Sequence, residues 1–310
     1  MKGDIFLLVD GSAIVHRAYH AMPPLTTSKG LQTGAIHGFF SMLLKVIHQL
    51  KPKHIAIAFD RPTPTFRKQL YVGYQANRPK MESDLSEQFE AIIKILVKAN
   101  IPVYAVDGFE ADDVIGTISE LANKKGEITY IVTGDRDMMQ LVDSDTKVLM
   151  PIKGISEVSV YDAEKVREKF GINPDKIVEL KALMGDASDN YPGVAGVGPK
   201  TAAMLIEEYG NVDNVYQNID KVAAKNPKLA QKLIDGAEAA ALAKKLAKIL
   251  TDVPFTFSMH ECEMKNVDAN LWKDTLSSYE MKSLPKRIDE VFGPNGEITE
   301  AKKNNQMKLL

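Results

Sequence analysis

Short hydrophobic runs alternate with longer amphipathic stretches in the first half of the chain. The runs have the length and the Ile, Val and Phe content of buried strands, and they lie at residues 5–9, 54–59, 101–106 and 128–133. Between them, hydrophobic positions recur with a helical period at residues 33–50, 86–99 and 111–125. Strands that alternate with helices predict an α/β fold with a mostly parallel central sheet flanked by helices.

Helical patterns dominate after residue 151. Predicted helices lie at residues 163–170, 176–184, 200–209 and 228–250. The last stretch, from Gly293 onward, is polar and contains Pro294 and Gly296. We therefore expect an α/β core over residues 1–160, a helical region over 161–292 and a polar tail or linker over 293–310.

Composition limits the class of protein without naming a function. The chain has 310 residues, 45% of them hydrophobic, which is enough for a substantial core. Its N-terminal hydrophobic run is interrupted at Asp10, and no stretch approaches the roughly 20 apolar residues of a membrane span, so we expect a cytoplasmic protein. Cys262 is the single cysteine and is expected to pack in the core. A formal net charge of -2 gives no global sign of nucleic acid.

Acidic residues follow the predicted strands. Asp10, Asp60 and Asp135 come at or just after three of them, and the segment GFEADDVIG follows the fourth. Ligands of such sheets bind beyond the carboxyl ends of the strands, so these acids should share one edge. Together with three later aspartates they make a set of nine acids: Asp10, Asp60, Glu110, Asp112, Asp113, Asp135, Asp137, Asp186 and Asp189.

Oxygen ligands without His or Cys favour hard cations such as Mg²⁺ or Mn²⁺. Nine carboxylates exceed the needs of one ion, and two ions about 4 Å apart are suited to displacement at phosphorus. Each aspartate taken alone is equally well explained as a turn residue or a helix cap. It is their gathering at one edge that favours a metal site.

Two further stretches have features suited to nucleic acid. Residues 185–202, GDASDNYPGVAGVGPKTA, place three glycines before a helix that starts near Pro199 and Lys200, where backbone N–H groups can meet a phosphate. A simple turn between helices is the alternative. Residues 61–85 interleave basic and aromatic side chains that can neutralise phosphates and stack on unpaired bases. These are Arg61, Arg67, Lys68, Arg78 and Lys80 with Phe66, Tyr71 and Tyr74.

The segments LLVDGSAIVHRAYHA, AFDRPTPTFRKQLYVGYQANRP, GFEADDVIGT, VTGDRDMMQLV and KALMGDASDNYPGVAGVGPKTA together resemble the 5′ nuclease domain of bacterial DNA polymerase I, which is related to flap endonucleases. The resemblance covers nearly the whole chain. It implies a PIN-like 5′ nuclease core, a helical arch at about 61–85 and a helix-three-turn-helix element at about 185–210. It also implies a structure-specific 5′ nuclease that cleaves DNA at 5′ ends and flaps by two-metal-ion catalysis, in replication (RNA primer removal) and repair.

The same resemblance implies roles for individual residues. Asp10, Asp60, Glu110 and Asp112 would serve one metal ion, and Asp113, Asp135, Asp137, Asp186 and Asp189 the other. Tyr74 lies in the implied arch, and where many members have a lysine directly after this tyrosine the chain has the uncharged Gln75. We expect Arg78, four residues after Tyr74, to supply the catalytic cation instead, with Lys68 as a second candidate. Residues expected to bind DNA are Arg67, Gly193, Gly196, Gly198, Lys200 and Thr201.

Expected partners are DNA with 5′ ends, flaps or nicks, RNA primers on DNA, and a polymerase domain in the same or another chain. We expect a nucleoid-associated monomer with a K⁺ ion at the helix-three-turn-helix element. Two alternatives stay open. A phosphatase of the haloacid dehalogenase type would need an aspartate at Ser12. A non-catalytic module that binds branched DNA would gain nothing from concentrated negative charge.

Overall fold

A six-stranded sheet forms the centre of the computed structural model, which describes residues 3–154 and 157–293. Its strand order is β3-β2-β1-β4-β5-β6, and every pair is parallel except β5 with β6. The strands are β1 Ile5–Asp10, β2 His54–Ala58, β3 Val103–Tyr104, β4 Ile128–Val132, β5 Thr146–Lys153 and β6 Glu157–Tyr161. The predicted mostly parallel α/β sheet is thereby confirmed. The hairpin β5–β6 was not predicted, because its register shift near Pro151 interrupts the alternating pattern.

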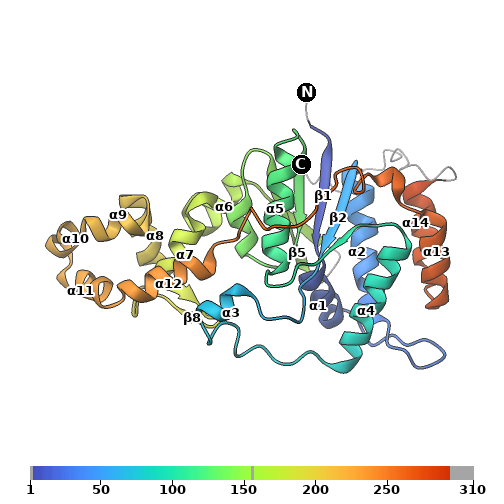
Figure 1. Cartoon of the computed structure of the whole chain (residues 1–310), viewed down its shortest axis with the longest axis horizontal. Coiled ribbons are helices and arrows are strands. Elements are labelled where there is room, and N and C mark those ends of the chain that lie inside the picture. The colour runs from blue at the N-terminus through green and yellow to red at the C-terminus, as the bar shows by residue number, and fades with distance from the viewer. Residues whose placement is uncertain (1–2, 155–156, 294–310) are drawn as a thin grey trace.

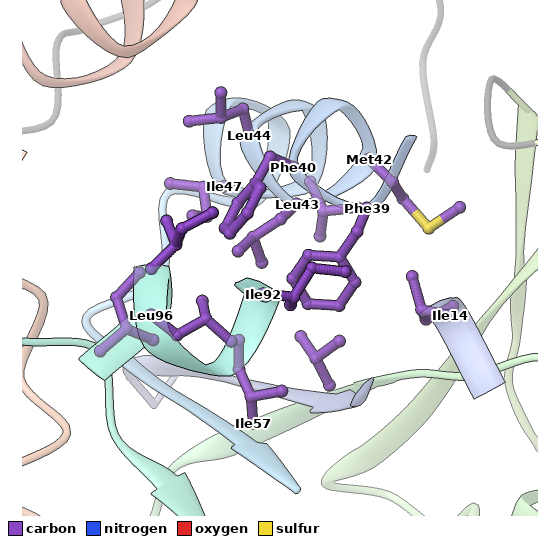
Figure 2. Packing of buried hydrophobic residues seen from close by; sticks show 14 of the residues in the cluster. Ile14, Phe39, Phe40, Met42, Leu43, Leu44, Ile47, Ile57, Ile92 and Leu96 are labelled. Carbon is purple, nitrogen blue, oxygen red and sulfur yellow. The ribbon is translucent and has the colours of Figure 1, made fainter. Parts of the chain in front are cut away.

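Helices cover both faces of the sheet (Figure 1). Alternate residues of β1 belong to different cores: Leu7 and Val9 face one side, and Phe6 and Leu8 face the other. The first side is covered by α1 Gly11–Ala21, α2 Gly34–Leu50, α4 Ser83–Lys98, α13 Ala269–Ser278 and α14 Leu284–Phe292. Figure 2 shows its packing, with Phe39 and Phe40 of α2 opposite Ile92 of α4. The other side is covered by α5 Ala111–Asn123 and by the helical region.

The helical region extends away from the sheet (Figure 1). Its helices are α6 Ala163–Phe170, α7 Ile177–Met184, α8 Pro199–Tyr209, α9 Val212–Gln217, α10 Ile219–Lys225, α11 Pro227–Asp235 and α12 Ala237–Ala247. The predicted single helix over residues 228–250 is wrong, because the chain breaks at Gly236 and leaves the helix after Ala247. After α12 the chain returns to the sheet, where the carbonyl of the buried Cys262 accepts the N–H of Ile55. The expected packing role of Cys262 is confirmed.

The segment 61–85 crosses the lower edge of the molecule in Figure 1. Only α3, Phe66–Leu70, and the first turn of α4 are helical within it, and the rest consists of turns and irregular chain. The helical part of the expected arch is therefore shorter than predicted. The expected tail, 293–310, lies outside the described residues except for Gly293. No helix among the described residues is both long and apolar enough to cross a membrane.

Candidate active site

Three predicted acids meet at the carboxyl edge of the sheet. Asp10 ends β1, Asp60 follows β2 by two residues, and Asp135 follows β4 by three. Because β1 lies between β2 and β4, the three chain ends are neighbours. Asp10 caps α1 by accepting the Ala13 N–H at 2.9 Å, and its other oxygen accepts the Thr133 hydroxyl at 2.7 Å.

Side chains that the sequence did not point to hold the other two aspartates. The Ser12 hydroxyl accepts the Asp60 N–H at 2.9 Å, and the Thr133 hydroxyl accepts the Asp135 N–H at 2.9 Å. Thr133 therefore contacts two acids at once. The Ala111 N–H at the start of α5 donates to Asp60 at 2.9 Å, which ties a third element to the same edge.

The acids of GFEADDVIG lie at the N-terminus of α5. Glu110 is the N-cap residue, and Asp112 and Asp113 occupy the first turn. Unpaired backbone N–H groups and the helix dipole favour negative charge there, which explains part of this concentration of acids. Asp113 also accepts the Glu110 N–H at 3.2 Å, in a capping box.

Asp113 is not placed as a metal ligand, which corrects the expectation. Its side chain is fully buried, and both carboxylate oxygens are bound by the guanidinium of Arg67 at 2.7 and 2.8 Å. Arg67 is itself only 2% exposed. The expectation that Arg67 contacts DNA is also wrong in this structure, because its charge is used inside the protein. The sequence alone does not reveal the Arg67–Asp113 pair. Every basic residue of segment 61–85 is an equally good candidate for phosphate binding.

Within the described part of the chain, no basic side chain forms an ion pair with Asp10 or Asp112, whereas Glu110 has Arg67. Burial raises the pKa of Asp10 to about 7, and the charges of Asp60 and Asp135 act in the same direction. Burial also raises the pKa of Glu110 to about 7, although the Arg67 charge opposes this. For Asp112, burial and then the charge of Asp135 hold the pKa well above its usual range. This arrangement is electrostatically unfavourable without positive charge and therefore fits a divalent cation.

A second group of acids lies beside the first. Asp137, Asp186 and Asp189 each offer an oxygen within 4.8 Å of the others, and they are the one such group of three found among the described residues. Asp137 begins a 3-10 helix after β4, Asp186 ends the two-residue strand β7, Gly185–Asp186, and Asp189 lies in the turn that follows it. Burial, followed by the charge of Asp135, raises the pKa of Asp137 to about 7. The group thus brings together oxygens from two distant segments in the geometry of a cation site.

Lys181 on α7 is a site residue that the sequence analysis missed. Its ammonium group contacts both Asp137 and Asp186. Burial alone would raise the pKa of Asp186, but hydrogen bonds from Lys181 and Ser188 outweigh burial and lower it. The ammonium group of Lys181 lies between the carboxylates of Asp137 and Asp186, which shows that this group of acids accommodates positive charge. Lys181 is the only basic residue of the helix α7, IVELKALM. This was the feature of the sequence from which its place in the site could have been inferred.

Residues of segment 61–85 reach Asp189. Gln75 Nε2 donates to Asp189 Oδ1 at 3.0 Å, and Arg78 Nη2 donates to the same oxygen at 3.2 Å. Tyr74 is buried, and its hydroxyl lies 3.4 Å from Asp189 Oδ2 and 3.1 Å from Glu110 Oε2. Tyr74 therefore joins the two groups of acids. Lys68 is exposed on α3, and no contact between it and these acids occurs within the described residues.

The glycine-rich stretch joins α7 to α8 through the short hairpin β7 Gly185–Asp186 and β8 Tyr191–Pro192. A Cβ atom at Gly193 would lie 2.3 Å from the backbone nitrogen of Gly185, so only glycine fits there. Gly196 has a φ of 74°, and Gly198 is the N-cap of α8. Lys200 is exposed in the first turn, and Thr201 is half-buried beside it. The stretch presents the N-terminus of α8 to solvent, as phosphate binding requires.

A cavity of about 600 Å³ opens beside Asp135. Its lining includes His16, Arg17 and His20 of α1 with Gly134 and Gly154. Arg17 Nε donates to the Gly154 carbonyl at 2.7 Å. The cavity places basic and imidazole groups next to the acidic edge.

Comparison with known proteins agrees with this geometry. The family model of the 5'-3' exonuclease N-terminal resolvase-like domain matches residues 5–171, and that of the 5'-3' exonuclease C-terminal SAM fold matches residues 172–270. A 5'-3' exonuclease of Aquifex aeolicus is 38% identical over 92% of this chain and 95% of its own length. DNA polymerase I of Bacillus caldotenax is 40% identical over 84% of this chain but only 30% of its own length. The chain thus spans about a third of the DNA polymerase I relatives it matches.

Solved structures share the fold. A 5'-exonuclease of bacteriophage T5 with bound zinc superposes with a TM-score of 0.65 at 21% identity, over 92% of this chain and 99% of that one. A bacteriophage T5 flap endonuclease in complex with DNA and metal ions gives 0.64 at 21% identity, over 89% of this chain and 99% of that one. The fold and the relatives define a nuclease, and its acidic groups could hold metal ions. The chain belongs to the 5'-3' exonuclease family.

Proposed function

We propose that this chain hydrolyses DNA phosphodiesters at 5′ ends and 5′ flaps with two Mg²⁺ or Mn²⁺ ions. The observation that carries the proposal is the convergence of two acidic groups at one sheet edge, joined by the Tyr74 hydroxyl. All candidate metal ligands in these groups are carboxylate oxygens, which suits hard divalent cations.

Each group would hold one ion. The first ion would be held by Asp10, Asp60, Glu110 and Asp112, and the second by Asp135, Asp137, Asp186 and Asp189, some of them through water. When bound, such ions activate water and neutralise the leaving oxygen. The chain's own side chains orient these ligands, because Thr133, Ser12 and Arg67 fix individual carboxylates or their backbone.

Substrate binding would use two surfaces beside the acids. Arg78 remains 57% exposed while it contacts Asp189, so its guanidinium can also meet a phosphate oxygen. Backbone N–H groups at the start of α8 and the exposed Lys200 would hold the duplex backbone without reading its sequence. A K⁺ ion at the glycine-rich stretch would reinforce that contact.

The biological substrates we infer are nicked or flapped DNA and RNA primers on DNA, during replication and repair. A polymerase domain in the same or another chain would supply these substrates. The protein would act as a monomer on the nucleoid in the cytoplasm.

Cleavage of a 5′-labelled flap and of nicked duplex tests the proposal. We expect products only with Mg²⁺ or Mn²⁺, none in excess chelator, and a 5′ phosphate on the downstream strand. Full cleavage activity in excess chelator would show that the proposed two-metal mechanism is wrong.

Asp135→Ala separates catalysis from binding. We expect it to abolish cleavage while it retains much of the DNA affinity, because affinity depends on segment 61–85 and α8 rather than on Asp135. Asp220→Ala, at an acid in the first turn of α10, is the matched control and should behave like the parental protein. Absence of cleavage by the parental protein with intact flap binding would favour a binding module instead.

A further inference from the structure

We propose that Arg67 is a positioning residue that ties the base of segment 61–85 and the chain after α12 to the Glu110 carboxylate of the candidate metal site. This inference rests on the proposed function. It replaces the DNA contact expected from the sequence with an internal role that involves three segments of the chain.

The guanidinium of Arg67 uses its full donor capacity. An arginine has five N–H groups in a rigid plane, and five contacts of Arg67 are present. Nε donates to the Leu246 carbonyl at 2.8 Å, and Nη2 donates to the Lys248 carbonyl at 2.7 Å and to Asp113 at 2.8 Å. Nη1 donates to Asp113 at 2.7 Å and to Glu110 Oε2 at 3.1 Å. No N–H group of Arg67 is left for a phosphate.

Arg67 treats its two carboxylate partners differently. Asp113 receives two parallel bonds from the guanidinium and also accepts the Leu250 N–H at 2.9 Å, so its charge is compensated inside the protein. Glu110 receives a single bond from Arg67, at Oε2, which also accepts the Tyr74 hydroxyl. Its other oxygen, Oε1, accepts the Thr65 hydroxyl at 3.3 Å, and no basic side chain of the described residues pairs with it. The arrangement fixes the orientation of Glu110 and leaves Oε1 without the charged partner that Oε2 has.

Three chain segments meet at this side chain. Arg67 belongs to α3, Glu110 and Asp113 begin α5, and Leu246 and Lys248 end and follow α12. The Phe66 N–H also donates to the Gly108 carbonyl at 3.0 Å, which fixes α3 to the chain just before α5. Figure 1 shows α3 beside the helical region at the point where that region meets the sheet. A change at Arg67 would therefore alter how the DNA-binding half and Glu110 are held together.

Lysine cannot replace this arginine geometrically. An ammonium group has three donors around one nitrogen and cannot reach both Asp113 oxygens, Glu110 and two carbonyls together. Arg67→Lys therefore keeps the positive charge but loses the orientation of Glu110. Arg287→Lys is the matched control, because Arg287 donates to the Ser41 carbonyl at 3.1 Å on the other side of the molecule.

The test measures Mn²⁺ binding to the DNA-free protein by calorimetry. Loss of a partner that orients a metal ligand weakens affinity by about 10- to 100-fold. We expect Arg67→Lys to bind the more tightly held Mn²⁺ ion at least tenfold more weakly than the parental protein does. Arg287→Lys should bind it with the parental affinity. The salt dependence of flap binding in chelator should keep the parental slope. An unchanged Mn²⁺ affinity, or a slope reduced by about one unit as for a lost phosphate contact, would overturn the proposal.

A double variant distinguishes positioning from charge balance. Arg67→Met alone leaves Asp113 buried without its cation and is expected to lower Tm. Arg67→Met with Asp113→Asn removes both charges, so Tm should recover while Mn²⁺ affinity stays low. Recovery of both would mean that Arg67 only neutralises Asp113. None of these measurements uses cleavage, so a failure here leaves the proposed nuclease function standing, whereas an inactive parental protein would overturn that function independently.

Discussion

Arg78 and Gln75 donate to one oxygen of Asp189, although neither residue lies in a helix. In a helix, Tyr74 and Arg78 would lie on a common face because they are four residues apart. In this structure, turns bring both side chains to Asp189 instead. Gln75 has a φ of 52°, in the left-handed region, and its N–H donates to the Asp189 carbonyl at 2.8 Å. The backbone, rather than a helical period, sets which side chains reach the acids.

Arg78→Ala should lower single-turnover cleavage of a 5′ flap by about 100-fold, as for the loss of one oriented electrostatic contact. The measurement is made at saturating Mg²⁺. Arg61→Ala is the control from the same segment, since Arg61 is paired with Asp107 at 2.7 Å away from Asp189. A parental rate for Arg78→Ala would mean that another group stabilises the developing charge.

Gln75→Lys should leave that rate unchanged or raise it. A lysine would keep a donor beside Asp189 and add a charge near the scissile phosphate. The same single-turnover assay checks this, with Gln75→Met as the control that removes the donor without adding charge. Severe impairment of Gln75→Lys would show that the amide itself is needed.

Gly236, at the break between α11 and α12, occupies a place where a side chain would be crowded. A Cβ atom at Gly236 would lie 2.9 Å from Val194 Cγ1 and 3.1 Å from the Lys232 carbonyl oxygen. Val194 lies within the glycine-rich stretch, so the break between the two helices packs against the chain that leads into α8. A hydrophobic period alone does not reveal such a contact, and for this reason one long helix was predicted.

Gly236→Ala should therefore destabilise the fold by about 1–3 kcal/mol, the usual cost of overpacking. Chemical denaturation followed by circular dichroism measures the change. Gly198→Ser is the control, because no atom lies within 4 Å of a Cβ there and serine is a good N-cap residue. Equal stability of Gly236→Ala and the parental protein would contradict the steric explanation.

The first turn of α8 is the element on which duplex binding should depend. Lys200→Ala should weaken binding to duplexes of any sequence and reduce the salt slope by about one unit, as expected for one lost phosphate contact. Fluorescence anisotropy over a series of salt concentrations measures both quantities. Lys98→Ala at the end of α4 is the control, and an unchanged slope for Lys200→Ala would remove that lysine from the interface.

The collected acids should make the stability of the whole molecule depend on pH and metal. In the folded protein the pKa values of Asp10, Glu110 and Asp137 are raised to about 7, above the value near 4 of an unfolded chain. The native state then binds more protons between these values, so its stability falls as pH rises through that window.

In chelator, Tm should therefore decrease from pH 5 to pH 7.5. Added Mg²⁺ should raise Tm more at pH 7.5 than at pH 5, because carboxylates bind the ion only when deprotonated. Scanning calorimetry at matched ionic strength, with Na⁺ as the control, checks both effects. Equal Mg²⁺ shifts at the two pH values would argue against these acids as ligands.

The sequence by itself determined the α/β class, the positions of the main strands along the chain and the edge at which the acids gather. These follow from local periodicity and from the rule that parallel strands end on one side. Asp10, Asp60 and Asp135 were identified correctly as neighbours for that reason.

Only the tertiary structure decided how each charge is compensated. Arg67 and Asp113 are 46 residues apart, and Lys181 and Asp137 are 44 apart, so no local pattern links them. A buried arginine in a basic segment has the same sequence appearance as one that meets phosphate. Burial and contacts between distant segments decide which carboxylates pair with a basic side chain and which are available as metal ligands. These contacts exist only in the folded chain.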